Sequence, residues 1–312
     1  MENITDDVSD WRKAGAIAAT ALRYGRDMIK PGAKMLEVLD AVEKKIFELG
    51  GEIGFPAQMS FGDVAAHDCA DPDDDREIPE TVVKMDVGVS VNGAIGDNAW
   101  TVDLTGEHAH LLKASQNALK VSIETAKVGV EIGKVGKAIQ DAMEAEDCIP
   151  ISNLSGHGIA RYKVHTSPSM PNYDNKNPNK LQKGMIVAIE PFSTTGTKGL
   201  VRELERANIF MQVGKRPVRS PMTRDILKVI QSYNGLPFTT RYLTKQFPKG
   251  KVNFALKDLM KNEIIRAYPP LREESGGMVA QFENTLYIGD ETEVLTKPLK
   301  GHSFDEKFRE FI

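Results

Sequence analysis

The clearest structural signal lies in residues 81–104, which read TVVKMDVGVSVNGAIGDNAWTVDL. β-Branched and other apolar residues dominate both sides of Asn92-Gly93, and Asn-Gly is the strongest short signal for a two-residue turn between antiparallel strands. We therefore predict a β-hairpin with strands over residues 81–89 and 93–104.

Two acidic residues occupy this hairpin. With Asn92 and Gly93 in the turn, Asp97 faces Gly88 and lies diagonal to Asp86, so the two carboxylates project from one face. Gly88 would leave room between them for something other than a side chain. Like charges inside a sheet repel and are costly to desolvate, and a metal ion is the usual counter-charge. A lone Asp in a strand is more often an edge or turn residue, but this pair within apolar flanks favours metal ligands.

Helical periodicity appears on both sides of the hairpin. Apolar residues at helical spacing predict a helix over about 11–22, ended by Pro31-Gly32, and a second helix over about 36–46 that stops before Gly50-Gly51. A related pair of helices is expected between residues 111 and 146.

The two helix pairs resemble each other at a fixed offset of 97 residues. The matched positions are Lys30 and Lys127, Gly32 and Gly129, Val38 and Val135, Ala41 and Ala138, Val42 and Ile139, and Ile46 and Met143. They suggest two halves of similar build. Any two amphipathic helices that follow a glycine share such a pattern. The helices alone therefore leave open whether the two halves are truly repeated or only alike by chance.

Further strand-like runs lie in the second part of the chain. Residues 185–190 and 278–288 are apolar or alternate in polarity, and several of their residues are β-branched. Together with the hairpin and the helix pairs, they predict an α+β domain with a central antiparallel sheet covered by helices.

A segment of different character, residues 214–272, lies between these two runs. It holds 13 Lys and Arg against three acidic residues, a net charge of +10, which leaves −14 for the rest of the chain. Its apolar spacing predicts three short helices and a terminal hairpin, a winged-helix-like pattern. Its basic face would meet RNA or the ribosome, or it would be a structural insert with a solvated lysine surface. The sequence leaves both possibilities open.

Composition limits the classes of protein to consider. The 312 residues are 41% apolar, enough for a substantial core, and the net charge of −4 argues against a general polyanion binder. Cys69 and Cys148 do not form a disulfide framework, and the chain begins without a secretory leader, so we expect a cytoplasmic protein. No apolar run approaches the roughly 20 residues needed to cross a bilayer.

Three more residues are candidate metal ligands. His157 lies in Asn-Leu-Ser-Gly-His-Gly, and Glu190 and Glu283 each end or interrupt an apolar β-type run. A glutamate there is unfavourable unless it is paired or bound. Singly, each is as well explained as a salt-bridged core residue. Together with the hairpin acids, they are the ligand mix for two divalent cations that share carboxylates.

At this point the sequence resembles a known family, the methionine aminopeptidases. Five motifs resemble, in order, the metal-ligand motifs of that family: Lys84-Met85-Asp86-Val87-Gly88, Ile95-Gly96-Asp97, Ser155-Gly156-His157-Gly158, Ala188-Ile189-Glu190-Pro191-Phe192 and Ala280-Gln281-Phe282-Glu283. The family has the pita-bread fold, two related α+β halves around the metal site, which would account for the offset of 97. The insert resembles the helical subdomain of the type II branch, here in its minimal, archaeal form.

The resemblance implies a role for each ligand. Asp86 would bind one metal, Asp97 and Glu283 would bridge both, and His157 with Glu190 would bind the other. Such a set suits two divalent ions, Co, Mn, Fe or Zn, and the sequence does not choose among them.

Two further histidines match family stretches that lie beside the substrate. The stretch from Phe55-Pro56 to Ala65-Ala66-His67 resembles one, and Tyr162-Lys163-Val164-His165 resembles the other. His67 and His165 are 98 residues apart, close to the repeat offset. Either histidine alone would more often be structural or lie on the surface.

The resemblance also implies a mechanism. Two cations would turn a shared water into hydroxide, polarise the scissile carbonyl and hold the free α-amino group. Glu190 would carry the proton to the leaving amine, while His67 and His165 would hydrogen-bond the peptide.

The implied function is removal of the initiator methionine from nascent polypeptides. Phe55, Val164 and Phe192 are the candidates for the apolar methionine pocket, and a small second residue would be preferred. The catalytic domain would comprise residues 1–213 and 273–312, with the insert at 214–272. We expect a monomer without membrane contact. Its partners would be the N-termini of nascent polypeptides and, through the insert, the ribosome.

Two other functions fit the same motifs, and one stretch of the sequence departs from the family pattern. Xaa-Pro aminopeptidase and prolidase share the fold and the five ligands, and a pita-bread protein without catalysis could bind RNA or the ribosome through the insert. After His67 the sequence runs Asp68-Cys69-Ala70-Asp71-Pro72 and then Asp73-Asp74-Asp75, unlike the usual family pattern. We predict a solvated loop here, which leaves the outer rim of the substrate cleft in doubt.

Overall fold

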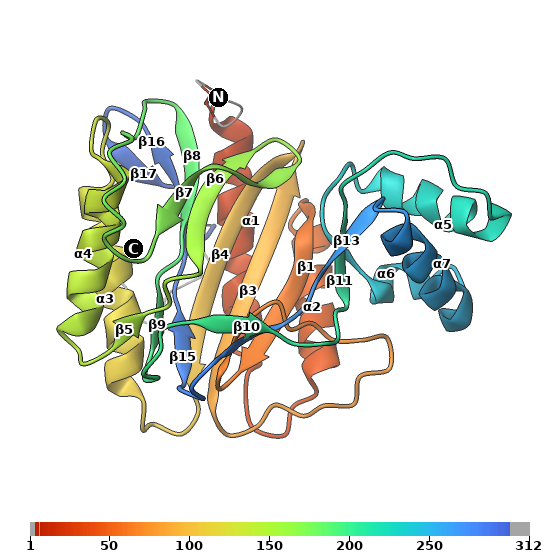
Figure 1. Ribbon diagram of the computed structural model, residues 1–312, viewed down its shortest axis with the longest axis horizontal. Coiled ribbons are helices and arrows are strands. Elements are labelled where there is room, and N and C mark those ends of the chain that lie inside the picture. Colours follow the sequence, from red (N-terminus) through yellow and green to blue (C-terminus); the bar gives the residue numbers. More distant parts are fainter. Residues whose placement is uncertain (1–3, 6, 300–312) are drawn as a thin grey trace.

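A computed structural model describes residues 4, 5 and 7–299 of the chain (Figure 1). The last residues of the expected catalytic domain, 300–312, lie outside this range. The first half holds two helices, a long central hairpin and two accompanying strands. Its elements are α1 (Ser9–Arg26), α2 (Met35–Glu48), β1 (Glu52–Phe61), β2 (Val64–Ala66), β3 (Val82–Val91) and β4 (Ala94–Asp103).

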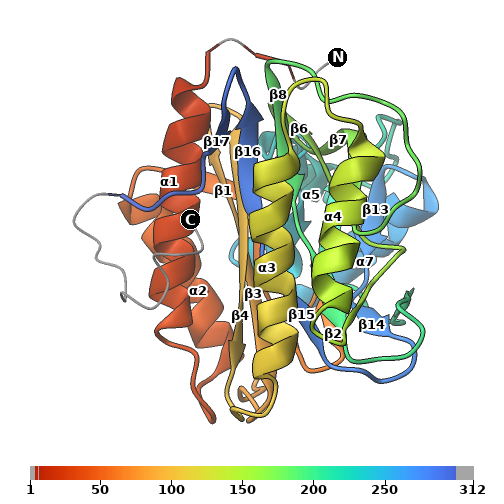
Figure 2. The same ribbon diagram turned by 90° about the vertical axis from the view of Figure 1, so that its left-hand side faces the viewer.

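The second half repeats the order of two helices followed by strands. Its elements are α3 (Ala109–Thr125), α4 (Ile132–Glu144), β5 (Ile149–Pro150), β6 (Ser155–Ala160), β7 (Lys163–Pro171), β8 (Met185–Ile189), β9 (Phe192–Thr194), β10 (Val201–Glu203), β11 (Ile209–Gln212), β15 (Val279–Gln281), β16 (Asn284–Ile288) and β17 (Thr292–Val294). Figure 2 shows the pair α1–α2 and the pair α3–α4 beside the long strands of the two halves.

Each helix pair has its own apolar core against the strands of its half. Ile17, Val42 and Ile46 pack with Met85 and Val87 of β3, and all five are buried. A second cluster joins buried residues of α3 and α4 to β8 and β16, among them Leu111, Val135, Ile139, Val187 and Leu286. The predicted α+β architecture is therefore confirmed.

The hairpin has the predicted register. Asn92 and Gly93 have φ of 50° and 82°, the two left-handed residues that a tight hairpin turn requires. Gly88 faces Asp97, as expected. The space over Gly88 is nevertheless filled by a side chain, because a Cβ there would lie 2.2 Å from the ring of Phe55. The expectation that Gly88 leaves room for something other than a side chain was wrong.

Equivalent hydrogen bonds support the repeat. Gly32 and Gly129 both have positive φ, 79° and 82°. The matched backbone bonds run from Gly32 N to Ile78 O and from Gly129 N to Leu181 O, and from Ile78 N to Ala33 O and from Leu181 N to Val130 O, all between 2.8 and 2.9 Å. Each helix pair is thus joined to its half by the same local pattern, which similar helices alone would not require.

The strand expected over 278–288 is divided in two. β15 ends at Gln281 and β16 begins at Asn284. Between them, the backbone N–H of Glu283 donates to the carbonyl of Ala99 in β4 at 3.1 Å. The chain changes partners at this point, because β15 pairs with β9 whereas β16 pairs with β8.

The insert contains three helices, as predicted, but its terminal hairpin does not form. Its elements are α5 (Pro221–Ser232), β12 (Phe238–Thr239), α6 (Thr240–Thr244), α7 (Lys249–Lys261), β13 (Ile265–Tyr268) and β14 (Leu271–Glu273). β13 pairs with β11, and β14 pairs with β10 and β2. β11 thus forms a small sheet with β12 and β13 of the insert, whereas β14 joins strands outside the insert and connects its end to the rest of the molecule. Figure 1 shows the three helices on the side of the molecule opposite α3 and α4.

No helix among the described residues is both long and apolar enough to span a membrane.

Candidate metal centre

Strands from both halves meet where the candidate ligands lie. Asp86 and Asp97 project from β3 and β4 of the first half. His157 lies in β6, Glu190 follows the last residue of β8, and Glu283 precedes the first residue of β16. β6 and β16 both pair with β8, so these three residues reach the same edge of the second-half sheet.

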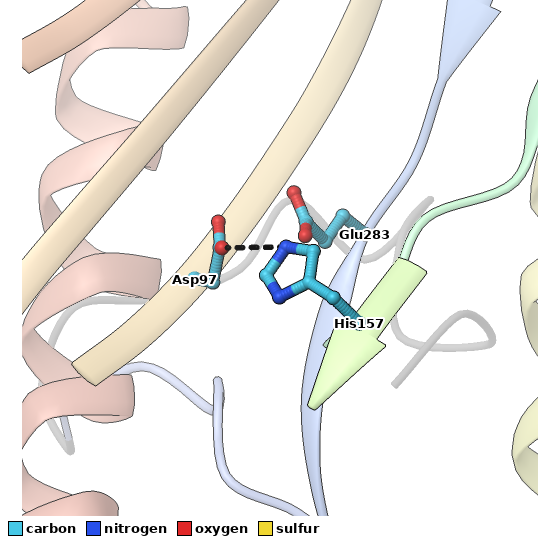
Figure 3. A group of neighbouring side chains, drawn as sticks. All are labelled: Asp97, His157 and Glu283. Carbon is cyan, nitrogen blue, oxygen red and sulfur yellow. Dashed lines mark ion pairs between the residues drawn. The ribbon is translucent and has the colours of Figure 1, made fainter. Parts of the chain in front are cut away.

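The side chains of Asp97, His157 and Glu283 point toward one another (Figure 3). His157 Nε2 lies 3.7 Å from Asp97 Oδ2 and 3.5 Å from Glu190 Oε1. One ligand atom each from Asp97, His157 and Glu283 lies within 4.8 Å of the others. This spacing fits donors around a metal ion, because ligand distances near 2 Å leave neighbouring ligand atoms a few ångströms apart.

The carboxylates are crowded and buried, and this sets their protonation. Burial raises the pKa of Asp97 to about 7. Burial, and then the charge of Asp97, raise the pKa of Asp86, Glu190 and Glu283 well above the ordinary carboxyl range. Buried charges of one sign require a counter-charge. Asp86 Oδ1 is buried without a hydrogen-bond partner in the described structure, which suits an oxygen directed at a cation.

His157 is oriented as a ligand would be. Its Nδ1 lies 3.2 Å from the carbonyl oxygen of Gly158. A proton on Nδ1 satisfies that carbonyl and leaves the lone pair of Nε2 directed at the carboxylates. Burial, and then His165, lower the pKa of His157, so the neutral form needed for metal binding is favoured.

Both predicted substrate histidines border the same cleft. The rings of His157 and His165 meet edge to face, with centroids 4.2 Å apart. His67 lies near Tyr268, with ring centroids 6.0 Å apart, and its backbone N–H donates to Gln58 Oε1 at 2.8 Å. Burial, and then His165, lower the pKa of His67 to about 4. His67 is therefore neutral at physiological pH and offers one donor and one acceptor.

The cleft has a volume of about 250 Å³, and all ten residues predicted for the site line it: Phe55, His67, Asp86, Asp97, His157, Val164, His165, Glu190, Phe192 and Glu283. Phe55, Val164 and Phe192 are 5%, 4% and 2% exposed. Their side chains form an apolar wall beside the polar centre, as a pocket for a methionine side chain requires.

Sequence reasoning missed one residue that supports the carboxylates and several that line the cleft. Gln281 Nε2 lies 3.3 Å from Glu190 Oε2 and 3.5 Å from Glu283 Oε2, and so holds both carboxylates. Its signal was its place two residues before Glu283 in a buried strand. Met211, Pro237, Tyr268 and Leu271 line the rim from the side of the insert. No local pattern marks them, because distant parts of the chain bring them to the cleft; Tyr268 pairs with Ile209, and Leu271 pairs with Ala66.

The loop after His67 is less solvated than predicted. Cys69 and Ala70 are completely buried, and Asp68 accepts two hydrogen bonds from Arg76 at 2.8 and 3.0 Å. The loop also contacts the insert, because Asp73 pairs with Lys249. The expectation of a solvated loop was wrong for its first part. The sequence gives no sign of these contacts, and Lys249 lies far along the chain from Asp73.

A buried ion pair connects the insert to the core near this loop. Arg241 of α6 is 3% exposed and donates to Glu43 of α2 at 2.7 and 3.1 Å. The hydroxyl of Tyr242 donates to the same carboxylate at 2.7 Å. The Arg241 guanidinium also reaches Cys69 Sγ at 3.8 Å. Because Cys69 is two residues from His67, the insert helps to support the wall of the cleft.

Comparison with known proteins agrees with this geometry. Metallopeptidase family M24 matches residues 9–290. The chain is 42% identical over 287 residues to a methionine aminopeptidase of Thermococcus kodakarensis, covering 91% of this chain and 97% of that protein. It is 33% identical to methionine aminopeptidase 2 of Schizosaccharomyces pombe, covering 91% of this chain and 71% of that protein.

A solved structure of the methionine aminopeptidase of Thermotoga maritima has the same fold, with a TM-score of 0.70 at 23% identity, and covers 95% of this chain and all of that one. The fold is thus the pita-bread fold expected from the five motifs. With a family match over nearly the whole described chain and named relatives at about 40% identity, this chain belongs to metallopeptidase family M24, among its methionine aminopeptidases.

Proposed function

We propose that this chain is a two-metal aminopeptidase that removes the initiator methionine from nascent polypeptides in the cytoplasm. One observation carries the proposal: four carboxylates and one imidazole converge beside two histidines and an apolar wall in a single cleft. The names of its relatives point the same way.

The chain's own donors would hold the metals. Asp86 would bind one ion, Asp97 and Glu283 would bridge, and His157 with Glu190 would bind the other. When bound, two divalent ions lower the pKa of a shared water and polarise the scissile carbonyl. Oxygen-rich donors with one imidazole suit Mn, Fe, Co or Zn.

Proton transfer falls to Glu190. Its carboxylate lies at the polar centre, with Oε1 3.5 Å from His157 Nε2, beside the place where the attacking water would be held. It would accept the proton of the attacking water and deliver it to the leaving amine.

The peptide would be held by the two histidines. Neutral His67 donates or accepts a hydrogen bond at the peptide, and His165 lies against His157 at the metal end of the cleft. Together they would orient the scissile bond and stabilise the oxyanion of the tetrahedral intermediate.

The specificity would follow from the closed apolar wall. Phe55, Val164 and Phe192 are nearly fully buried and bound the space for the first side chain. A cleft of this size would favour a small second residue, because a bulky one would meet the histidines.

The test is release of free methionine from Met-Gly-Met-Met and from a Met-Pro peptide. Metal-stripped protein is supplied in turn with Mn, Co, Fe or Zn. Metal-dependent release supports the proposal and ranks the metals. Cleavage confined to the Met-Pro peptide would instead support a proline-specific peptidase. Stoichiometric metal binding without release from either peptide would refute the aminopeptidase activity.

A second role for the insert is favoured by its charge. The insert carries +10 while the rest of the chain carries −14. Contact with ribosomal RNA would be strongly salt-dependent, because phosphate contacts release counterions. Co-sedimentation of the protein with ribosomes between 50 and 200 mM salt tests this. A bound fraction that does not change with salt concentration would argue against it.

A further inference from the structure

A second hollow lies beside the catalytic cleft, between α2, the β6–β7 turn and the insert. It has a volume of about 720 Å³. We call it the exit groove. Its apolar and aromatic lining residues are Phe47, Ile53, Tyr162, Tyr233, Leu236, Pro237 and Tyr242, and charged residues of α2, β1 and α6–α7 complete its border. We propose that it binds apolar side chains of the polypeptide substrate several residues beyond the scissile bond. This inference rests on the proposed aminopeptidase function.

The exit groove adjoins the cleft. Pro237 lines both spaces. Leu236 is 6% exposed and packs in the same apolar cluster as Phe55 and Val164, two residues of the predicted methionine pocket. One wall, formed by the loop after α5, therefore bounds the methionine pocket on one side and the exit groove on the other.

Tyr162 is held in an unfavourable conformation that places an aromatic ring in this groove. Its φ is 58°, in the left-handed region where Gly, Asn and Asp are tolerated best. Its N–H donates to Gly93 O at 2.8 Å, and its ring covers Gly93, where a Cβ would lie 2.4 Å from the ring. Turn formation alone would favour a small residue here, so this ring points to a role in binding.

Exposed apolar side chains gather around Tyr162. Tyr162 is 37% exposed, and Phe47 of α2 is 59% exposed. A neighbouring hollow of about 840 Å³ shares Tyr162 and Asn234 with the exit groove and adds Val213, which is 47% exposed. A group of exposed apolar side chains on one face usually marks a binding surface, whereas single exposed apolar residues do not. Unfolded nascent chains supply apolar side chains to fill it.

The distance suits a long substrate. Tyr162 follows His157 by five residues along the β6–β7 hairpin, and its contact Gly93 precedes Asp97 by four residues. At roughly 3.3 Å per residue, both paths place Tyr162 about 15 Å from the metal ligands. Figure 1 shows this hairpin turn close to the end of β3 and β4. An extended peptide needs about five residues to cover that distance, so a tetrapeptide does not reach the exit groove.

The experiment compares peptide length and groove variants. Metal-loaded protein is assayed with Met-Gly-Met-Met, with a 12-residue Met-Gly peptide carrying Leu at positions 6 to 8, and with the same peptide carrying Ser there. Tyr162→Asn keeps a residue that tolerates the left-handed turn, and Phe47→Ser changes the opposite wall. Phe254→Ser is the matched control, because Phe254 is 55% exposed on α7 and does not line the groove.

The Leu peptide is expected to have a KM roughly tenfold below that of the Ser peptide, as burial of one or two apolar side chains would give. Tyr162→Asn and Phe47→Ser should remove most of that advantage and leave the tetrapeptide unchanged, while Phe254→Ser changes nothing. Equal KM values for the Leu and Ser peptides would overturn the inference. A loss of activity in Tyr162→Asn that is equal for the 12-residue peptide and the tetrapeptide would also overturn it.

Binding separates this inference from the proposed function. Fluorescence anisotropy of a labelled Leu peptide measures groove binding without cleavage, in wild-type protein and in Tyr162→Asn. If no peptide is cleaved, the aminopeptidase proposal fails, yet tighter binding of the Leu peptide that Tyr162→Asn abolishes would still support the groove. Cleavage of the tetrapeptide with no difference in anisotropy would refute the groove alone.

Discussion

Glu190 combines two roles at the residue scale, because it lies beside His157 and is also held by Gln281. Glu190→Gln keeps the size and the hydrogen bond but cannot carry a proton. We expect kcat to fall by roughly 10²- to 10⁴-fold. Methionine release and metal content are measured together. A variant with full metal content and unchanged kcat would show that another group transfers the proton.

Asp97 gives a prediction about pH in metal-stripped protein. Its folded-state pKa of about 7 lies above its ordinary value of 3.8, so the folded state binds the extra proton. The contribution of Asp97 to stability is therefore fully present below about pH 4 and is lost as pH rises to 7, by on the order of a few kcal/mol, which a comparison of wild type with Asp97→Asn isolates. Urea unfolding across this range tests the slope, which Asp97→Asn should flatten. A stability that rises with pH over this range in metal-stripped protein would contradict the assignment.

The candidate metal ligands could be singled out in the sequence because their chemistry conflicts with their setting, whereas the substrate histidines and the apolar pocket residues came from the family resemblance. Asp86, Glu190 and Glu283 are carboxylates within apolar strand patterns, and all of them line the cleft. Gln281 was missed because a neutral amide in a strand raises no such conflict. The neighbours of Cys69 were missed because the Arg241 contact joins positions far apart in sequence.

At the scale of elements, the buried pair of Arg241 and Glu43 connects α6 of the insert to α2. Arg241→Met leaves the Glu43 carboxylate buried without its counter-charge, and we expect a loss of about 3–5 kcal/mol in the free energy of unfolding. Adding Glu43→Gln should recover more than half of it. Urea unfolding followed by tryptophan fluorescence measures both.

The control for this prediction is Arg216→Met. Its partner Glu263 is 73% exposed in its side chain, and exposed pairs contribute less than about 1 kcal/mol. If Arg216→Met and Arg241→Met cost the same, the insert is not held by the buried pair.

Local sequence signals predicted the helices and strands well, but they predicted poorly which strands pair with each other. The hairpin register followed from Asn92-Gly93 alone, because a two-residue turn fixes it. The division of the run 278–288 and the absent hairpin at the end of the insert could not be foreseen. Both depend on distant partners, such as Ala66, which pairs with Leu271.

At the scale of the whole molecule, the candidate metal centre joins the two halves. Asp86 and Asp97 come from the first half, and the other ligands come from the second. A metal that binds only the folded chain should raise the free energy of unfolding by about 2.7 kcal/mol at 100 times its dissociation constant. Asp86→Asn and His157→Ala should each reduce that gain. Thermal unfolding with and without chelator measures it.

The matched control is again Phe254→Ser, which should keep the full gain. A gain that survives loss of the ligands in one half would mean that the metal binds within the other half alone.

The repeated bonds at Gly32 and Gly129 bear on how such a protein arose. One half supplies two carboxylates and no imidazole ligand, so a half-length ancestor alone would have offered an incomplete site. Two copies related by a two-fold axis would have brought two such sets together. Fusion of the copies would then have freed each to change separately. On this account, one copy would have kept its paired aspartates, while the other would have acquired a histidine and the insert.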